Sequence, residues 1–435
     1  MLKYPVYLGR CTQYNSEKIF EVLQSALTVV PLSKKISGKI VIKPNLVLAH
    51  PRIATDGFTR AEVIESVVKL ILSEALDKTS IEIVEKAGLG VTTAGMFRWA
   101  GYKKLTKKYP VKLRSMEESK QAVLVLKNSK IHKHITVARP IAERDYLVFV
   151  PKLKTNVLSQ GYTGALKLNI GSIDSQERLL AHDHRLPQKI VDLLEVINPD
   201  LIVTDGIRFS YGGNQMTQTG MDFGVIAVST NAVAHDMICA TLIGHDPMQI
   251  RHIREAVERG YGPRSITDIE IVGDFPLKKG SALVKGVDFG YKPVDQFDSN
   301  FTIHCGYPYC TGGCHGIFLD WLHMIKDRKP SLFKRFPKLD LVIGKIDKNL
   351  KVSKVLLIGD CAQASLGIEA GRIIRIKGCP PTHKRIIWDM MVKLFLLAPL
   401  VRPSLIIDGF ILYPLKKFKG WLLNLKYKPL QKEPE

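Results

Sequence analysis

The chain has 435 residues, of which 46% are hydrophobic and 24% are charged. This composition is typical of globular domains and excludes a collagen-like or wholly disordered chain. Lys and Arg number 63 against 41 Asp and Glu, so the formal net charge is +22. Such a charge favours small anions, acidic proteins or an anionic membrane surface as partners. No single run of basic residues carries it, so we expect no specific nucleic-acid partner.

The sequence predicts a cytoplasmic protein. Its first residues contain no apolar core of a secretory signal. No stretch of about 18 uninterrupted apolar residues predicts a transmembrane helix; residues 386–413 come nearest, but charged residues and prolines interrupt them. Seven cysteines in a cytosolic chain are read first as metal ligands or redox groups.

Apolar runs and helical periodicity alternate along the chain. The predicted strands are residues 39–43, 80–85, 145–150, 200–204, 223–228, 339–344 and 354–359. The predicted helices are residues 60–74, 189–196 and 231–243, the first with a capping box from Thr59 to Glu62. Such alternation predicts an α/β fold, mainly parallel sheet flanked by helices, with a second, smaller cysteine-bearing α/β domain. We place the domains at residues 1–275 and 276–385, followed by an amphipathic basic segment at 386–435.

Lysines next to small residues follow several predicted strands. The motifs are Lys43-Pro44-Asn45, Pro151-Lys152-Leu153-Lys154-Thr155 and Thr163-Gly164-Ala165-Leu166-Lys167. Ligands of open α/β sheets collect beyond the carboxyl ends of the strands, and lysine suits phosphate or carboxylate. We therefore expect Lys43, Asn45, Lys152 and Gly164 to bind an anionic substrate or cofactor, and Lys154 and Lys167 to act in catalysis. The plainer interpretation is that these lysines are solvated loop charges.

Two further polar positions are candidates for catalysis. His182, in His182-Asp183-His184, could exchange protons near neutral pH, although such a triplet can equally be a solvated loop or a helix cap. Asp205 follows a predicted strand and could orient a substrate or a metal. Its alternative role is that of a turn former before Gly206.

Five cysteines gather in the last third of the chain: Cys305, Cys310, Cys314, Cys361 and Cys379. They lie on separate predicted loops, the first of which leads into a helix, and loops of this kind can converge on one metal centre. Cys379 precedes proline, as cysteines at iron–sulfur sites often do. The spacing C-x4-C-x3-C matches neither the common ferredoxin series nor paired zinc knuckles. We expect an iron–sulfur cluster of the 4Fe-4S type, with structural zinc or free thiols as alternatives and one cysteine to spare.

An ordered series of motifs resembles the domain of unknown function 362 family. The series comprises the three lysine motifs, Asp205-Gly206 and the segment from Gly224 through Gly244 to Gly260, and it spans residues 38–265. Members are often described as iron–sulfur proteins, and many append a ferredoxin module with C-x2-C-x2-C repeats. This chain has its own cysteine set in place of that module. The resemblance implies a redox role in an anaerobic context.

The C-terminal segment alternates apolar blocks with lysines from residue 388 to residue 426. A basic segment interleaved with Phe and Trp can lie on an anionic bilayer. It can equally pack on its own domain or form the arm of a homo-oligomer.

Together these features predict an iron–sulfur oxidoreductase that holds an anionic small molecule in lysine-rich loops beside a cysteine-ligated cluster. The alternative is a non-catalytic electron carrier or a structural zinc protein. Either reading implies an electron-donor protein or another partner that docks on the positive surface.

Overall fold

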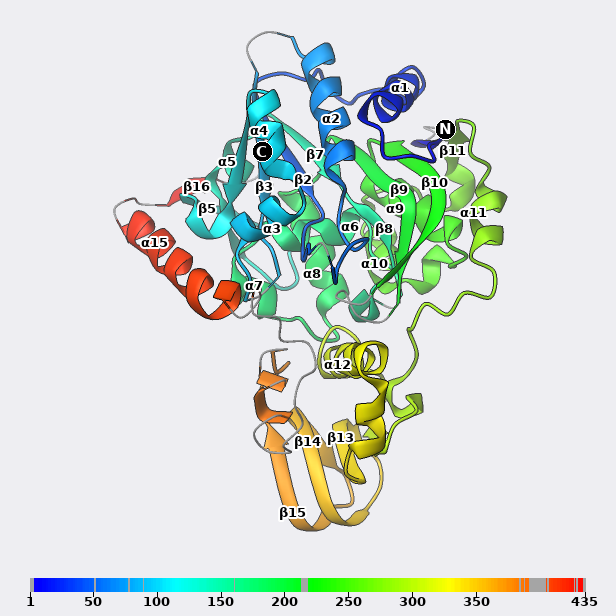
Figure 1. Ribbon diagram of the computed structural model, residues 1–435, viewed down its shortest axis with the longest axis vertical. Coiled ribbons are helices and arrows are strands. Elements are labelled where there is room, and N and C mark those ends of the chain that lie inside the picture. Colours follow the sequence, from blue (N-terminus) through cyan, green and yellow to red (C-terminus); the bar gives the residue numbers. More distant parts are fainter. Residues whose placement is uncertain are drawn as a thin grey trace.

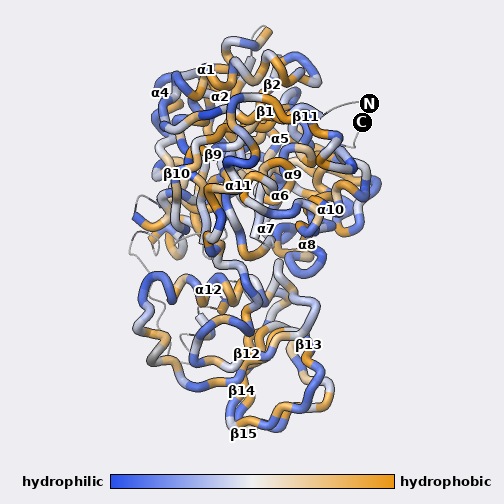
Figure 2. The backbone as a smooth tube through the Cα atoms, turned by 90° about the vertical axis from the view of Figure 1, so that its right-hand side faces the viewer, coloured by the Kyte–Doolittle hydropathy of each residue, from blue (hydrophilic) through white to orange (hydrophobic). Residues whose placement is uncertain are grey.

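The computed structural model describes residues 4–50, 52–76, 79–88, 90–159, 161–212, 218–382, 385–386, 388–390, 404, 407–425, 427 and 429–432. These residues form a large lobe built on a mixed sheet and a small lobe built on a parallel sheet (Figure 1). Figure 2 shows the same separation from the side, with helix α12 (Cys314–Arg328) at the junction.

The large lobe contains a nine-stranded sheet with the order β11-β1-β10-β9-β7-β2-β3-β4, and β8 pairs with β9. Its strands are β1 (Tyr4–Arg10), β2 (Lys39–Pro44), β3 (Ser80–Glu85), β4 (Val111–Ser115), β7 (Tyr146–Val150), β8 (Lys152–Lys154), β9 (Leu201–Tyr211), β10 (Thr219–Ser229) and β11 (Ile269–Val272). All the pairs are parallel except those that β10 makes with β1 and β9. The carboxyl ends of β2, β3, β7 and β9 therefore lie at one edge of the sheet.

Helices cover both faces of this sheet, so its central strands read as continuous apolar runs. In β2, Ile40 and Ile42 face one apolar core and Val41 faces the other. The first core includes α1 (Ser16–Leu27), α2 (Ala61–Glu74) and α3 (Thr93–Trp99). The second includes α5 (Arg139–Glu143), α6 (Ala165–Leu168), α8 (Leu186–Asp192), α9 (Ala232–Leu242) and α10 (Arg251–Glu258).

Three short elements complete the large lobe. They are α4 (Leu105–Lys108), α7 (Ser175–Leu179) and α11 (Leu277–Leu283). A hairpin of β5 (Gln121–Val125) and β6 (His134–Ala138) forms a separate small sheet. Helix α11 packs on α9, where a side chain on Gly280 would meet Leu242, so the large lobe extends through residue 283.

The small lobe is a parallel β-roll with the order β12-β13-β14-β15. Its strands are β12 (Phe301–Cys305), β13 (Leu339–Ile346), β14 (Leu350–Ala364) and β15 (Ile368–Ile376). β13 and β14 turn back at Gly344 and Gly359, whose φ angles of 75° and 95° suit glycine. α12 covers one face of the roll, and the returning arms enclose a second core.

The end of the chain returns to the large lobe. Asp408 accepts hydrogen bonds from the Thr92 amide (2.7 Å) and hydroxyl (2.6 Å). After the π-helical turn Ile407–Leu412, helix α15 (Tyr413–Leu425) lies against the lobe, and β16 (Leu430–Lys432) pairs with β5. No helix among the described residues is long and apolar enough to cross a membrane.

The predicted α/β class is confirmed, including a largely parallel sheet and a smaller lobe that carries the five late cysteines. The predicted capping box is wrong: Arg60 caps α2 without a side-chain bond. The Thr59 hydroxyl instead donates to the Val150 carbonyl (2.7 Å), because that neighbouring strand ends beside it.

Candidate functional site

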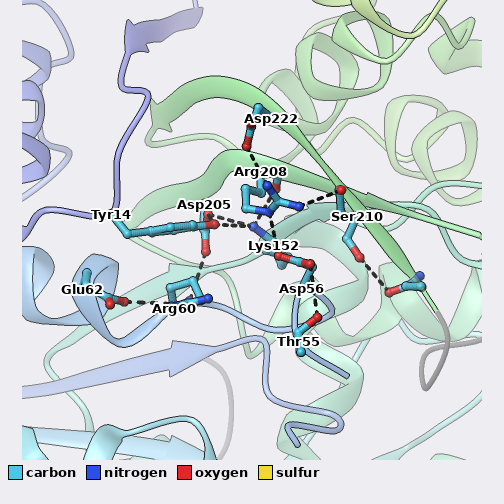
Figure 3. A network of polar contacts seen from close by, with 12 residues as sticks. Tyr14, Thr55, Asp56, Arg60, Glu62, Lys152, Asp205, Arg208, Ser210 and Asp222 are labelled. Carbon is cyan, nitrogen blue, oxygen red and sulfur yellow. Dashed lines mark hydrogen bonds and ion pairs between the residues drawn. The ribbon is translucent and has the colours of Figure 1, made fainter. Parts of the chain in front are cut away.

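Two of the four predicted lysines are neutralised inside the large lobe. The Lys43 ammonium lies 2.8 Å from both Glu85 carboxylate oxygens, and both side chains are buried. The Lys152 ammonium lies 2.9 Å from the Asp205 carboxylate, which also accepts from the Tyr14 hydroxyl (2.9 Å) (Figure 3). These buried pairs satisfy their own charges, and losing either partner would leave an unpaired buried charge.

The other two lysines have no carboxylate within hydrogen-bonding distance among the described residues. The Lys154 ammonium, on a side chain only 1% exposed, donates to the Gly57 carbonyl (3.0 Å). Lys167 is partly buried and donates to the Asn156 side-chain oxygen (3.1 Å). Burial and then the neighbouring Lys152 charge lower the pKa of Lys154 to about 8. Burial, Lys154 and Arg178 lower the pKa of Lys167 to about 7.

Further cations surround this pair. Lys189, which is buried, donates to backbone carbonyls of Arg178 (2.8 Å) and Leu180 (2.7 Å), and burial lowers its pKa to about 7. The Arg178 guanidinium donates to the Ala87 carbonyl (2.8 Å). Glu85 and Asp174 act on Arg178, and Asp183 acts on Lys189, so carboxylates offset part of this charge. Carbonyl oxygens satisfy the hydrogen bonds without cancelling charge, and a bound anion would offset what remains.

Unpaired polar atoms belong to the same strand ends and loops. Among the described residues, the buried side-chain oxygens Oδ1 of Asn45 and Oγ of Thr155, Ser172 and Ser175 have no hydrogen-bond partner. Buried polar atoms are rarely left unpaired in folded proteins. These oxygens could therefore hydrogen-bond a ligand held by the lysines, as predicted for Asn45.

The structure gives Asp205 and Gly164 surroundings that differ from those expected. Asp205 is fully buried, and its second oxygen accepts from the Arg60 amide (3.0 Å), so its oxygens are engaged within the protein. Gly164 lies against the Asp236 carboxylate, which accepts from the amides of Ala165 (2.7 Å) and Leu166 (2.9 Å). An internal carboxylate thus already occupies the anion position beside Gly164, because the same helix start that would attract a ligand attracts Asp236.

His182 joins the large lobe to the cysteine loop. Its Nδ1 lies 2.5 Å from the Gly312 carbonyl, so Nδ1 carries the proton and donates. Burial and then Lys189 and Lys167 lower its pKa to about 3, so His182 is neutral at physiological pH. A side chain on Gly312 would meet the Asp183 carbonyl, which makes this contact between the lobes close. A small pocket at this contact is lined by Ser159, Asp183, Arg251, His252, Thr311 and Gly312.

The thiols come from one end of the β-roll. Cys305 ends β12, Cys361 follows the Gly359 bend within β14, Cys379 lies just after β15, and α12 begins at Cys314. The corners of β14 and β15 are joined by a hydrogen bond from the Asp360 amide to the Gly378 carbonyl (3.1 Å). A Cβ on Gly359 would lie 2.6 Å from the Cys314 sulfur, and a Cβ on Gly313 would lie 2.6 Å from the Cys310 sulfur. Glycines therefore make room for the sulfur atoms.

The thiols also interact with one another. Burial and then Cys310, Cys361 and Cys379 raise the pKa of Cys314. Burial raises the pKa of Cys310 to about 11, with contributions from Asp183 and Cys379, while backbone amides of His184 and Cys314 oppose the rise. Burial, Asp295 and Cys310 raise the pKa of Cys305 to about 12. All seven cysteines are free thiols, and Cys11 and Cys239 lie in the cores of the large lobe.

The thiols do not form a metal-binding group in their present positions. Among the described residues, no three His, Cys, Asp or Glu side chains form a group that could hold a metal ion. One zinc ion needs all its thiolates at about 2.3 Å, so the thiols would have to draw closer to bind it. The metal assignment itself stays a prediction.

Comparison of the chain with known proteins gives a family match in the large lobe. Residues 40–241 match the family model described as "Domain of unknown function (DUF362)". The resemblance seen in the sequence is confirmed. A curated relative, "Thylakoid-associated protein sll1697" from Synechocystis sp., is 23% identical over 256 residues, or 58% of this chain and 75% of the relative. Among solved structures, the lactate racemase apoprotein from Thermoanaerobacterium thermosaccharolyticum is 12% identical with a TM-score of 0.34. That match covers 54% of this chain and 57% of the racemase chain.

The DUF362 match contains the lysine motifs and ends before the cysteines, so the small lobe lies outside it. Sequence reasoning missed Arg178, Lys189 and Arg185 as charged neighbours of the site. Lys189 had a signal, because it interrupts the apolar face of α8 formed by Leu186 and Ile190. Arg185 follows the His182–His184 triplet directly. Its hydrogen bonds to Asp183 raise its pKa, and Cys379 and Cys310 contribute less to that rise.

Proposed function

We propose that the protein is an iron–sulfur redox enzyme that binds a small anionic molecule or cofactor between its two lobes. The observation that supports this most is the position of Lys154 and Lys167. Among the described residues they have no carboxylate within hydrogen-bonding distance, and they lie close enough to the cysteine-bearing lobe to interact with its Asp320. Burial lowers the pKa of both lysines, and Asp320 of α12, the helix that begins at Cys314, opposes that lowering. The excess positive charge and the thiols therefore share one interface, a common place for binding sites.

The proposed roles follow from the contacts. Lys154 and Lys167 bind the anion, and the unpaired oxygens of Asn45 and Thr155 orient it. His182, which is neutral, holds the cysteine loop through Gly312. Lys43, Lys152 and Asp205 support the strand ends through buried ion pairs.

Cys310, Cys314, Cys361 and Cys379 would hold the cluster, with Cys305 as a fifth thiol close to Cys310. A cluster bound there would supply or accept single electrons. Arg185 is paired with the Asp183 carboxylate (2.7 Å) and also interacts with Cys310 and Cys379, so the charge that it offers to the bound thiolates is partly offset.

The metal proposal is tested on protein purified without oxygen. Cys314→Ser should remove the visible absorption, the EPR signal, and the bound iron and sulfide. Cys11→Ser, a buried free thiol in the large lobe, is the matched control and should leave all of them unchanged. Wild-type protein with bound zinc and no iron would replace the cluster by the structural zinc alternative. A Cys314→Ser protein with a normal cluster spectrum would contradict the ligand assignment.

A second candidate function is that of an electron carrier, favoured by the exposure of Cys361 and Cys379 at the surface of the small lobe. The two functions differ in their response to anions. In the enzyme, sulfate or a small carboxylate held by Lys154 and Lys167 should shift the EPR signal of the cluster, and Lys154→Ala should abolish that shift. In a carrier, the spectrum should not respond to anions at all.

We also infer that the protein acts in the cytoplasm and contacts the periphery of a membrane. The name of its thylakoid-associated relative supports the membrane contact. An electron-donor protein is a further proposed partner, as is a second copy of the chain, and the positive net charge supports docking of acidic surfaces. We propose no specific nucleic-acid partner.

A further inference from the structure

Helix α15 is amphipathic with its apolar side turned outward. A helix packed on a globular protein ordinarily turns its apolar stripe to the core. Gly420 is the buried residue of α15, and a Cβ there would collide with the Glu117 carbonyl. Gly420 therefore lies on the side of α15 that contacts the large lobe, and its lack of a side chain allows that close contact.

Polar contacts hold the inner side. The Lys416 ammonium lies 2.7 Å from the Glu118 carboxylate. The Asn424 side chain accepts from the Gln121 amide (3.0 Å) and donates to the Ser119 carbonyl (3.2 Å). Residues 416, 420 and 424 repeat every four positions, so they form one face of the helix. The pairing of β16 with β5 fixes the chain again directly after α15.

The outer side carries large apolar side chains. We call it the outer stripe, and it consists of Leu415, Phe418, Trp421, Leu422 and Leu425. Leu415 is 61% exposed and Leu425 is 62% exposed. The rings of Phe418 and Trp421 stack with centroids 5.7 Å apart. Figure 1 shows α15 standing at the margin of the large lobe, away from the small lobe.

The apolar surface continues before the helix. Ile407, Phe410, Ile411 and Leu412 of the preceding π-helical turn are also exposed. Single exposed apolar side chains are ordinary, but a contiguous patch marks an interaction surface. This patch therefore indicates a surface that binds a partner, because the described part of the chain leaves it exposed to solvent.

Charge distinguishes between the two possible partners of this patch, a second copy of the chain and an anionic lipid bilayer. Lys417 and Lys419 lie exposed beside the outer stripe, and the whole chain carries a net charge of +22. A second copy on the stripe would bring these lysines and two such charges together, which like-charge repulsion opposes. An anionic bilayer takes Phe, Trp and Leu at the boundary of its acyl chains and attracts lysines to its headgroups.

We propose that the outer stripe of α15 binds the surface of an anionic lipid bilayer, with Lys417 and Lys419 at the headgroups and the rest of the large lobe above the membrane. This inference rests on the proposed membrane location and gives it a residue-level basis. It can be tested separately from the redox proposal, because the hydrogen bonds and the ion pair of α15 with other elements, among the described residues, join it to the hairpin side of the large lobe.

Vesicle sedimentation of the full chain tests the proposal. Wild-type protein should pellet with vesicles of mixed phosphatidylglycerol and phosphatidylcholine and stay in solution with phosphatidylcholine alone. Phe418→Asp combined with Leu422→Asp should weaken binding by about tenfold or more for each side chain lost from the bilayer. Leu366→Asp is the matched control, since Leu366 is also highly exposed but lies on a turn of the β-roll. It should bind as wild type does.

Tryptophan fluorescence provides a second, independent measurement of membrane binding. Trp421 fluorescence should shift to shorter wavelength when anionic vesicles are added, and Trp421→Phe should remove that response. Cys314→Ser should leave vesicle binding unchanged whether or not the protein holds a cluster, which separates this inference from the redox proposal. Equal binding of wild type and Phe418→Asp/Leu422→Asp would overturn the inference. A dimer in sedimentation velocity that the double substitution splits would assign the outer stripe to a second copy instead.

Discussion

The chemistry of the site depends on the difference between paired and unpaired buried lysines. Lys152 is paired with Asp205, and both side chains are completely buried. Lys167 and Lys154 are held by an amide oxygen and a carbonyl oxygen. Desolvation acts against all three ammonium groups. Lys152 has a buried carboxylate within hydrogen-bonding distance that offsets it, whereas Glu85 and Asp320 act on Lys154, and Asp320 acts on Lys167, only from further away. The same amino acid is thus structural at one position and available for a ligand two residues later.

Replacing these lysines by methionine should therefore have opposite effects on stability. Lys152→Met leaves Asp205 as an unpaired buried charge and should lower the free energy of unfolding by about 3–5 kcal/mol. Lys167→Met removes an uncompensated charge and should leave stability unchanged or raise it by about 1 kcal/mol, while anion binding falls by about 1–3 kcal/mol. Urea denaturation measures the first quantity and calorimetric titration with sulfate measures the second. A large loss of stability in Lys167→Met would show that this lysine is structural as well.

Anion binding should weaken at alkaline pH. The folded pKa of Lys167 is lowered from 10.5 to about 7, and an anion binds its protonated form. Affinity for sulfate should be constant below about pH 7 and fall by up to about tenfold per pH unit above it. Calorimetric titration of sulfate at several pH values checks this expectation. A flat affinity from acid to alkaline pH would mean that Lys167 does not contact the anion.

The same shift has the opposite effect on stability. Between about pH 7 and pH 10.5 the unfolded chain keeps the proton on Lys167 that the folded protein releases. The contribution of Lys167 to the free energy of unfolding in anion-free protein therefore rises with pH through this window. Comparing the pH dependence of wild type with that of Lys167→Met isolates the contribution.

At the scale of elements, the corners of the β-roll place the thiols. Parallel strands run in one direction through a sheet, so the end of β12, the Gly359 bend within β14 and the residues after β15 come to one end of it despite their distance in the sequence. Gly359 turns β14 back with φ of 95° and leaves space for the Cys314 sulfur. Gly359 thus has two roles: it adopts the backbone conformation of the turn, and its lack of a side chain lets the Cys314 sulfur lie close to the backbone.

Substitution at this corner should separate those two functions. Gly359→Ala should strain the backbone and also displace the Cys314 sulfur, so anaerobically reconstituted protein should lose most of its iron. Gly367→Ala has a similar φ of 102° but open space around its Cβ, so it should lower the melting temperature without loss of iron. Iron analysis and thermal melting give the two readouts. Equal iron content in both proteins would refute a cluster at Cys314.

At the scale of the whole molecule, His182 and the Gly312 carbonyl join the two lobes. Residues 284–300 form the connection between α11 and β12, a long segment with little regular structure, and Arg328 of α12 donates a further hydrogen bond to the Ile53 carbonyl of the large lobe (3.4 Å). The relative position of thiols and lysines therefore depends on contacts at the 182–187 and 310–316 segments and at Arg328.

Loss of this link should loosen the small lobe. His182→Ala leaves the Gly312 carbonyl without its donor and should destabilise the contact by about 1–3 kcal/mol. Faster hydrogen exchange in residues 310–316 and faster proteolysis in residues 284–300 are the expected results. His184→Ala, at an exposed side chain two residues away, is the control and should behave as wild type does. Unchanged exchange in His182→Ala would show that the other contacts, such as Leu158 against Gly316 and the hydrogen bond from Arg328 to the Ile53 carbonyl, are sufficient to join the lobes.

The sequence alone determined the α/β class, because β-branched runs such as Ile40-Val41-Ile42 and the periodicity of residues 60–74 follow from local backbone geometry and from burial on both faces of the sheet. It also separated the five late cysteines from Cys11 and Cys239, and its motif series marked the DUF362 region that the family match confirms. These features depend on residues that are near one another in the sequence, so sequence patterns can predict them.

Only the tertiary structure decided which charges are available. Glu85 lies 42 residues from Lys43 and Asp205 lies 53 residues from Lys152, and no local pattern announces such pairs. Neither could the sequence show that Asp236 occupies the helix start beside Gly164, or that α15 turns its apolar side outward. Long-range strand order sets these contacts, because the free energy of a buried charge depends on every neighbour that the fold brings to it.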